Sequence, residues 1–136
     1  MAIRTYKQNQ VKVKIAGFDV DEISEDDEIT IEYDRERITK KLDINKGGVY
    51  AIREGSPAKI TIPILVGSRW MSALNALQKA DQQIPLAIAD RNGYAGAKLH
   101  ITSSCMIQDA GVSYGADAPT INYVFDVMHL DEWILP

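Results

Sequence analysis

Among the side chains that can do chemistry, carboxylates cluster most densely in this sequence. Seven of them fall between residues 19 and 28. A loop that binds Ca²⁺ must supply several oxygen ligands, but this stretch has neither the ligand order of an EF-hand loop nor its central glycine. We therefore expect a solvated or partner-facing acidic loop rather than a metal site. Its carboxylates are Asp19, Asp21, Glu22, Glu25, Asp26, Asp27 and Glu28.

A second acidic group follows on one face of an extended segment. Glu32, Asp34 and Glu36 are spaced two residues apart, so a strand would place them on the same side. A glycosidase uses two carboxylates at a set separation across a cleft. Nothing in the neighbouring sequence predicts a raised pKa or a sugar-binding platform, so we do not expect this activity.

The remaining nucleophiles and bases do not form a catalytic pattern. His100 and His129 are the only histidines, no GxSxG motif is present, and Ser103 and Ser104 lie in the middle of a predicted strand. We expect His100 on the surface of that strand and Cys105, the only cysteine, in the core. The glycines match no phosphate-binding loop. The sequence therefore predicts no enzyme, no catalytic residue, no cofactor and no metal site.

The length and composition of the chain are those of an ordinary globular protein. It has 136 residues, 46% of them hydrophobic and 25% charged, with a net charge of −4, which fits a single domain. No apolar run approaches the length of about 20 residues that a membrane-spanning helix needs, and no secretory signal is visible. The acidic balance argues against general binding to nucleic acid. The negative charge is local, because outside residues 19–28 twelve acidic residues face fifteen basic ones.

Residues 28–44 form the longest extended segment that the pattern predicts. Apolar residues occupy odd positions up to Tyr33 and even positions from Ile38, so a bulge or tight turn is expected near Asp34–Arg37. The segment is either one long bulged strand, which would reach about 50 Å, or a hairpin. A segment this long would project from a small domain or pair with another chain. Its far half is basic, through Arg35, Arg37, Lys40 and Lys41.

Alternation and turn signals predict seven or eight strands and one helix. Residues 1–10 are polar and predict an N-terminal arm. A helix is expected over residues 68–82, with Ser68 as its N-cap and Leu74 on its apolar face. The fold class is therefore mainly β, an antiparallel sandwich or barrel with one packed helix. The other strands are expected near residues 11–15, 49–53, 58–66, 86–89, 96–108 and 121–130.

The last third of the chain is predicted to begin with a hairpin at Asn92-Gly93. In its return strand we expect the odd-numbered residues from Ala97 to Ile107 on one face and the even-numbered ones on the other. Near the C-terminus, Trp133-Ile134-Leu135 is an apolar tail. It docks either on a neighbouring subunit or back on its own domain.

The order of these features resembles that of the tail tube proteins of tailed bacteriophages, especially the contractile-tailed ones. The resemblance covers most of the chain as one domain over residues 1–136. It starts with the arm and the strand that ends at Ile15-Ala16-Gly17-Phe18, and passes through the acidic turn into residues 29–39. The segments that follow are Gly47-Gly48, Glu54-Gly55-Ser56-Pro57-Ala58-Lys59, residues 60–65, the helix and the hairpin at Asp90-Arg91-Asn92-Gly93.

The resemblance implies a structural subunit without enzymatic activity. Members of the family form hexameric rings in which each subunit adds strands to a continuous inner β-barrel, and the rings stack into a hollow tube that conducts DNA into the host. The implied partners are copies of the chain, a tail sheath, a tape measure, and terminator or baseplate proteins. The implied location is the tail of a virion assembled in the host cytoplasm. Alternatives are a tube initiator or terminator, a secretion-system tube protein, or a monomeric ligand-binding β-barrel.

The resemblance also assigns roles to the charged residues. An acidic lumen would repel passing DNA instead of binding it, which makes Glu28, Glu32, Asp34 and Glu36 the lumen-facing candidates. The basic residues of 28–44 would either face the lumen or pair with the acidic loop of a neighbouring ring. The candidates for contact between subunits are Asp21, Glu22, Glu25, Asp26, Asp27, Arg35, Arg37, Lys40, Lys41, Trp133 and Ile134.

Overall fold

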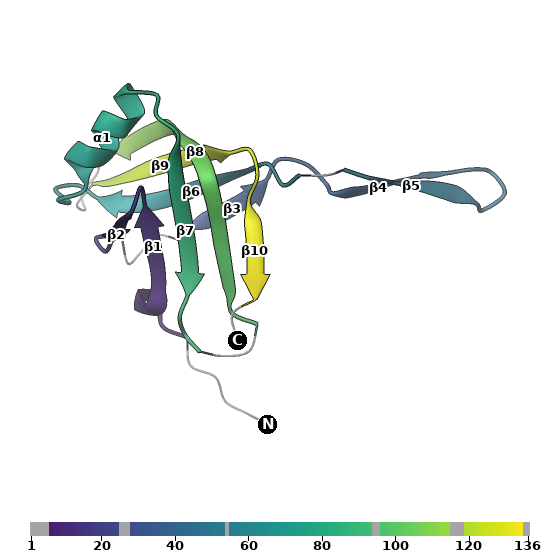
Figure 1. The fold of residues 1–136 in the computed structure, drawn as a ribbon, viewed down its shortest axis with the longest axis horizontal. Coiled ribbons are helices and arrows are strands. Elements are labelled where there is room, and N and C mark those ends of the chain that lie inside the picture. The colour runs from purple at the N-terminus through teal and green to yellow at the C-terminus, as the bar shows by residue number, and fades with distance from the viewer. Residues whose placement is uncertain (1–5, 25–27, 54, 94–95, 115–118, 135–136) are drawn as a thin grey trace.

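The computed structural model describes residues 6–24, 28–53, 55–93, 96–114 and 119–134. Within them, eight strands form one antiparallel sheet and two more form a separate hairpin (Figure 1). The main sheet contains β1 (Val11–Ile15), β2 (Phe18–Val20), β3 (Thr30–Tyr33), β6 (Ala58–Leu65), β7 (Ile84–Asp90), β8 (Lys98–Ser113), β9 (Thr120–Val127) and β10 (Asp131–Ile134). The separate hairpin consists of β4 (Ile38–Leu42) and β5 (Gly48–Ile52). The described helices are α1 (Met71–Lys79) and the short 3₁₀ turn η1 (Gln8–Gln10).

The main sheet folds over on itself because β8 belongs to both of its halves. The strand order is β2-β1-β7-β8-β9-β6-β3, with β10 also paired to β8. The first half of β8 pairs with β7 and β10, whereas its second half pairs with β9. In Figure 1, β7, β10 and the start of β8 run across the direction of β6 and β9. The two layers form an antiparallel sandwich with one helix, which confirms the predicted fold class.

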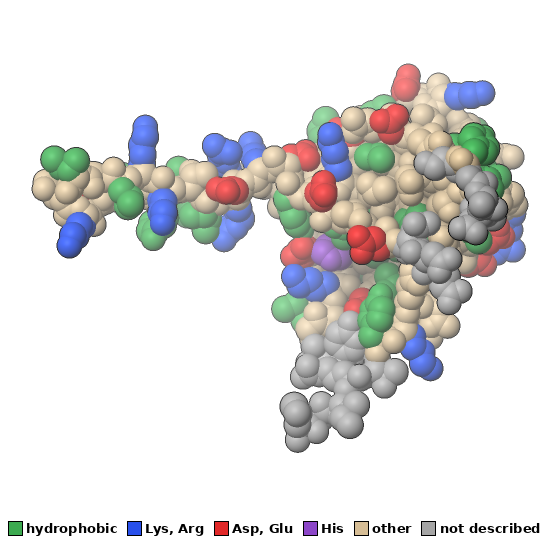
Figure 2. Space-filling model, turned by 180° about the vertical axis from the view of Figure 1, so that it is seen from behind, with side chains coloured by type: hydrophobic (Ala, Val, Ile, Leu, Met, Phe, Trp, Pro, Cys, Tyr) green, Lys and Arg blue, Asp and Glu red, His purple; other side chains and the backbone are tan. Residues whose placement is uncertain are grey.

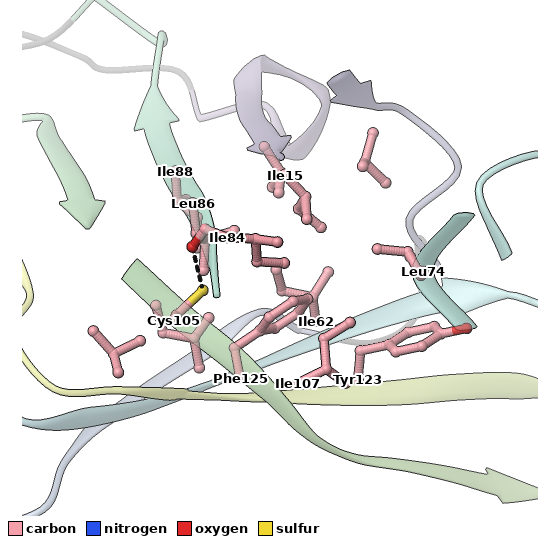
Figure 3. Close-up of a cluster of buried hydrophobic side chains, with 14 of the residues drawn as sticks. Ile15, Ile62, Leu74, Ile84, Leu86, Ile88, Cys105, Ile107, Tyr123 and Phe125 are labelled. Atoms are coloured by element: carbon pink, nitrogen blue, oxygen red, sulfur yellow. Dashed lines mark hydrogen bonds between the residues drawn. The ribbon is translucent and has the colours of Figure 1, made fainter. Parts of the chain in front are cut away.

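Alternating apolar residues from both layers make the core (Figure 3). Ile60, Ile62 and Ile64 on β6 are fully buried, as their period-two spacing predicted. They belong to one cluster with Ile15 of β1 and Phe125 of β9. Truncating such a residue to alanine lowers the free energy of unfolding by about 2–5 kcal/mol. Because the cluster contains residues of β1, β6 and β9, its burial stabilises both layers.

Cys105 lies in this core, as expected. It is buried on β8, and its thiol donates a hydrogen bond to the carbonyl oxygen of Ile84 at 3.3 Å (Figure 3). Burial raises the pKa of the Cys105 thiol to about 12. The thiol is therefore protonated and shielded at neutral pH, which is the state of a structural cysteine.

Helix α1 is shorter at both ends than the expected range of 68–82. It begins at Met71, and the Oγ of Ser68 accepts a hydrogen bond from the backbone N–H of Trp70 at 3.3 Å just before the helix. Leu74 is fully buried and anchors the helix to the core. The helix ends before Asp81, whose φ of 50° is left-handed and cannot continue an α-helix.

The even alternation expected for residues 96–108 is wrong. β8 contains two bulges, one between Thr102 and Cys105 and one directly after Ile107. An inserted residue reverses which side chains face the core. Thr102 is therefore buried and Ile101 exposed, whereas Cys105 and Ile107 return the odd positions to the core. The bulges let one strand serve both layers.

Residues 28–44 form neither one long strand nor a hairpin of their own. β3 ends at Tyr33 and pairs with β6, whereas β4 begins at Ile38 and pairs with β5. The phase change near Asp34–Arg37, where a bulge or tight turn was expected, falls in the link between these two strands. Beyond it the chain leaves the sandwich, and β4–β5 projects far from the other strands (Figure 1).

Both described ends of the chain are tied to the sandwich. The backbone N–H of Lys7 donates to Asn92 Oδ1 at 2.7 Å, and the N–H of Arg91 donates to the carbonyl oxygen of Gln10 at 2.9 Å. Residues 6–10, part of the expected N-terminal arm over residues 1–10, therefore lie along the β7–β8 connection. At the other end, β10 pairs with β8, so the backbone of the C-terminal strand docks on its own domain.

Candidate functional site

The β4–β5 hairpin is held by its own ladder and by a turn built around Asp43. Five residue pairs join the two strands. Asp43 Oδ1 accepts hydrogen bonds from the backbone N–H groups of Asn45 at 2.8 Å and Gly47 at 2.9 Å. At the root, the N–H of Arg53 donates to the carbonyl oxygen of Arg37 at 2.8 Å. The hairpin is thus ordered by local contacts while it projects from the domain.

The hairpin exposes large apolar side chains. Opposite residues of an antiparallel pair share a face, so Ile38 and Ile52 lie together, and Tyr50 and Leu42 follow on the same side. Lys40 lies on this face too, opposite Tyr50, whereas Val49 lies on the other face. A two-stranded hairpin alone is marginally stable in water, and a contiguous exposed apolar patch marks a surface that another molecule covers. The exposed fractions are Ile38 44%, Leu42 71%, Ile44 97%, Val49 68%, Tyr50 74% and Ile52 65%.

The hairpin is basic, while the rest of the chain is acidic. Residues 37–53 hold five basic side chains and one acidic one, a charge of +4. Since the whole chain carries −4, the remaining residues carry −8. Figure 2 shows Lys and Arg along the hairpin and Asp and Glu on the body. The sequence predicted a basic far half of 28–44, and the structure separates that charge in space. The basic residues are Arg37, Lys40, Lys41, Lys46 and Arg53.

The outer face of β3, β6 and β9 carries a ladder of charged residues. Glu32 of β3 lies opposite Lys59 of β6, and Lys59 lies opposite Asp126 of β9. All three residues are exposed, whereas their strand neighbours Ile60 and Phe125 are fully buried. The second half of β8 continues this layer beyond β9. The result is a four-stranded antiparallel unit that carries a row of charged residues across one face and buries apolar residues on the other.

Only one of the four predicted lumen-facing acids lies on this polar face. Glu32 is part of the ladder, whereas Asp34 and Glu36 are exposed in the link between β3 and β4, and Glu28 is exposed before β3 begins. The sequence interpretation missed Asp126. The alternation of β9 carried the signal, because it places that residue on the opposite face from buried Phe125.

A polar cluster beside the hairpin root joins β3 to β10. The hydroxyl of Tyr33 donates to Glu132 Oε1 at 2.5 Å, and Lys98 Nζ lies 3.5 Å from Glu132 Oε2. The hydrogen bond from Tyr33 is the main reason that the pKa of Glu132 is lowered, and Lys98 acts in the same direction. Burial and the bond to Glu132 raise the pKa of Tyr33 to about 12. The carboxylate thus holds the edge strand β3 against the C-terminal strand.

His100 is not the surface residue that the strand pattern predicted. Its side chain is only 17% exposed, and β8 places it between Ile88 of β7 and Glu132 of β10. Its Nδ1 lies 3.5 Å from Glu132 Oε1 and makes no hydrogen bond with any described residue. Burial lowers the pKa of His100, while Glu132 acts against this shift. The ring is therefore neutral at neutral pH and has a packing role.

Two of the predicted intersubunit acids are engaged within their own chain. Asp21 accepts hydrogen bonds from Arg69 Nη2 at 2.7 Å and from Trp70 Nε1 at 3.1 Å, and Glu22 lies 3.9 Å from Arg69 Nε. The Trp70 bond and Arg69 lower the pKa of Asp21. Trp70 also stacks on Phe18 with a centroid distance of 5.2 Å. These contacts fix β2 to the start of α1. Glu25, Asp26 and Asp27 lie outside the described residues.

The C-terminal strand keeps its side chains free although its backbone is paired. Trp133 is 61% and Ile134 71% exposed, while both pair with β8. Of the two alternatives for the apolar tail, the backbone docks on its own domain. The side chains of Trp133 and Ile134 remain available for contact with a partner.

Neither metal-binding nor membrane-spanning features occur in the described part of the chain. No three His, Cys, Asp or Glu residues gather there in a group that fits a metal ion. None of its helices is long and apolar enough to cross a membrane.

Several solved structures, among them a chain of an extracellular contractile injection system, share this architecture at low sequence identity. The tube-terminating cap of the anti-feeding prophage matches with a TM-score of 0.68 and 10% identity, over 99% of this chain and 95% of the other. A chain of the PVC sheath–tube complex, from an extracellular contractile injection system in its extended state, matches with a TM-score of 0.62 and 12% identity, over 96% and 93%. Hcp1 from Flavobacterium johnsoniae matches with a TM-score of 0.52 and 11% identity, over 93% and 99%. No protein-family model and no curated protein matches the sequence.

The likeness defines the class of the protein by its fold. The chain has the tail-tube fold, mainly β with one helix, over nearly its whole length. This confirms the resemblance to tail tube proteins at the level of the fold. At such low identities the fold is what the likeness establishes, so the function must be argued from the surfaces described above.

Proposed function

We propose that the chain is a non-enzymatic structural subunit of the tube in a phage-tail-like contractile apparatus. Copies would join into hexameric rings, and the rings would stack into a hollow conduit. The four-stranded unit β3-β6-β9-β8 carries this proposal. A closed wall around a wet channel needs strands that are polar on the channel side and apolar on the other, which is the arrangement of this unit.

The free edges of the unit support closure into a ring. β3 ends the strand order, and the second half of β8 pairs only with β9 among the described strands. Unpaired edges of this kind bind further strands unless they are blocked. If β3 of one subunit pairs with β8 of the next, every edge is satisfied and the polar faces line one channel. Glu32 and Asp126 would then be lumen-facing, with Lys59 between them.

The charge of this face and the solved structures with the same fold favour a particular cargo and a particular kind of apparatus. A channel wall with more acid than base repels DNA phosphates and lets DNA slide past, which suits a phage tail that delivers a genome. A tube of an extracellular injection system has the same geometry. The proposed partners are further copies of the chain, a sheath, and the proteins that close or measure the tube.

A terminating cap is the second candidate. The match to the tube-terminating cap of the anti-feeding prophage, with a TM-score of 0.68, favours it. A tube subunit must bind copies of itself at both ends of its ring, whereas a cap binds the tube at one end only. The two roles therefore predict different assemblies of the purified chain.

Negative-stain electron microscopy of the purified protein over a range of concentrations tests the proposal. Rods with a central hole support a tube subunit, and single rings that do not stack support a cap. A particle that stays monomeric at the highest concentration contradicts both roles. It would favour the alternative of a monomeric β-barrel.

A further inference from the structure

The C-terminal strand β10 is paired along one side only. Its four residues pair with β8, and no second described strand pairs with it. All four of its side chains are exposed. Directly before it, Leu130 is buried, and its backbone N–H donates to the carbonyl oxygen of Ser56 at 3.0 Å. Short terminal edge strands open at a low free-energy cost, so β10 can leave β8 while Leu130 stays anchored.

His100 lies beside this strand and has an unsatisfied ring nitrogen. Its Nδ1 is buried and makes no hydrogen bond with any described residue. Glu132 Oε1 of β10 lies 3.5 Å away, beyond the usual hydrogen-bond distance of roughly 2.7–3.2 Å. On the other side, the residue opposite His100 in β7 is the apolar Ile88. The charged group nearest to the ring therefore sits on the strand that can open.

Glu132 is already engaged by other groups. Tyr33 donates to the same Oε1 at 2.5 Å, and Lys98 Nζ lies 3.5 Å from Oε2. A proton on His100 therefore adds a second positive charge close to Lys98 and meets an acceptor that Tyr33 occupies. Burial of the ring lowers the pKa of His100, Glu132 raises it, and Lys98 lowers it further. The charged ring is thus poorly accommodated while β10 is paired.

The other titratable groups that face His100 come from three further segments. Asp90 of β7 already accepts hydrogen bonds from the backbone N–H and the side-chain amide of Asn92, at 3.1 Å and 2.6 Å. Glu28, before β3, and Tyr6, before η1, line the same hollow as His100 and are both exposed. Within the described part of the chain, Glu132 is therefore the one carboxylate at ion-pair distance from the ring.

We propose that His100 makes the joint between β8 and β10 sensitive to acid, so that protonation of its ring favours a state in which β10 has opened. In that state the charged ring reaches water, and Glu132 leaves Tyr33. The edge strand β3, from which the hairpin departs, then loses its tie to the C-terminal strand. The device belongs to a single subunit, so it stands or falls independently of the proposed tube.

Amide hydrogen exchange of β10 in the full chain, followed by mass spectrometry, tests this joint. The closed form binds the proton on His100 less tightly than the open form, so closing loses free energy as the pH falls below the ordinary pKa of 6.5. After correction for the intrinsic pH dependence of exchange, protection of β10 should fall by up to about tenfold between about pH 7.5 and about pH 5.5. Protection of β9 in the core should not follow this change.

Two glutamine variants separate His100 from other titrating groups. His100→Gln keeps a polar side chain that does not titrate, so its β10 protection should stay constant over the same range. His129→Gln is the matched control, because His129 is the other histidine of the chain and its side chain is 59% exposed. It should keep the acid response of wild type. An equal fall in wild type and His100→Gln, or no fall in wild type, overturns the proposal.

A second measurement needs no substitution. Slow deuterium exchange at the imidazole C2–H, followed by mass spectrometry, gives the pKa of each histidine in the wild-type chain. We expect the pKa of His100 to lie below 6.5. A pKa at or above 6.5 would mean that the closed joint holds the charged ring without cost, and this result would also overturn the proposal.

Discussion

Glu132 shows at the residue scale how one carboxylate connects segments far apart in sequence. Its partner Tyr33 is 99 residues away, and Lys98 and His100 approach from β8. Hydrogen bonds to a charged acceptor are stronger than neutral ones. The cluster therefore fixes β3, the edge strand from which the hairpin departs, to the C-terminal strand β10.

Replacing Tyr33 with Phe removes the hydrogen bond and keeps the ring. We expect the free energy of unfolding to fall by about 1 kcal/mol at neutral pH, measured by urea denaturation. Because the folded protein lowers the pKa of Glu132, its charged form stabilises the fold above the ordinary value of 4.5. This contribution is lost as the pH falls through the folded pKa. The difference between wild type and Tyr33→Phe should therefore shrink below pH 4.5.

Tyr114→Phe is the matched control, because Tyr114 is 84% exposed. The same change there should leave stability within about 0.5 kcal/mol of wild type. An equal loss in both variants, or a difference that does not change with pH, would contradict the role given to the Tyr33–Glu132 pair.

At the scale of elements, β8 and the hairpin divide the tasks of the fold. β8 uses two bulges to turn its side chains and to pair with β7, β10 and β9 in succession. The hairpin adds nothing to the core, since both of its strands are exposed along their whole length except at Thr39. The side chains of the hairpin therefore lie outside the core, and their surface is available for contact between copies.

The hairpin turn allows a sharp test with two adjacent glycines. A Cβ added at Gly48 would lie 2.7 Å from the backbone oxygen of Lys41, which cannot move without disturbing the ladder. At Gly47 the nearest atom, also at 2.7 Å, is the end of the Asp43 side chain. We expect Gly48→Ala to open the pairing next to the turn and Gly47→Ala to have a smaller effect. Amide hydrogen exchange of β4 and β5 measures both.

The sandwich supplies the internal reference for this test. Amides of β6 and β9 should keep wild-type protection in both glycine variants, and assembly should be weaker in Gly48→Ala. Equal protection of β4 and β5 in the two variants would mean that the turn tolerates a side chain at either position.

At the scale of the whole molecule, charge is divided between a basic projection and an acidic body. Opposite charges on the hairpin and on the body favour contacts in which the hairpin of one copy approaches the body of another. The polar ladder lies on β3, β6 and β9 of the sandwich and not on the projecting hairpin (Figure 1). Assembly and conduction would therefore use different surfaces, which can be altered independently.

Reversing the acids of the ladder tests the assignment of the channel. In Glu32→Lys with Asp126→Lys, we expect rods to form still, at a stability cost of about 1 kcal/mol from like charges opposite Lys59. The assembled variant should retain DNA roughly tenfold more strongly than wild type at low salt, measured by filter binding. Lys59→Glu adds acid to the same face and should retain no more DNA than wild type. Unchanged DNA retention in the double variant would place the channel elsewhere.

The sequence by itself determined the parts that depend on neighbouring residues. The period-two spacing of Ile60, Ile62 and Ile64 predicted a buried strand. The phase change near Asp34–Arg37 indicated an irregularity in the segment before the hairpin. Leu74 indicated which face of the helix is buried. The uneven charge was also visible, since counting needs no coordinates. These features follow from local geometry and composition, which the order of residues specifies directly.

Only the tertiary structure decided which residues meet across strands. The bulges of β8 reversed the faces around Thr102, pairing with β7 and β10 left His100 half-buried, and strand register aligned Glu32, Lys59 and Asp126 on one face. Register and layer packing depend on contacts between distant segments, and a shift of one residue exchanges the two faces of a strand.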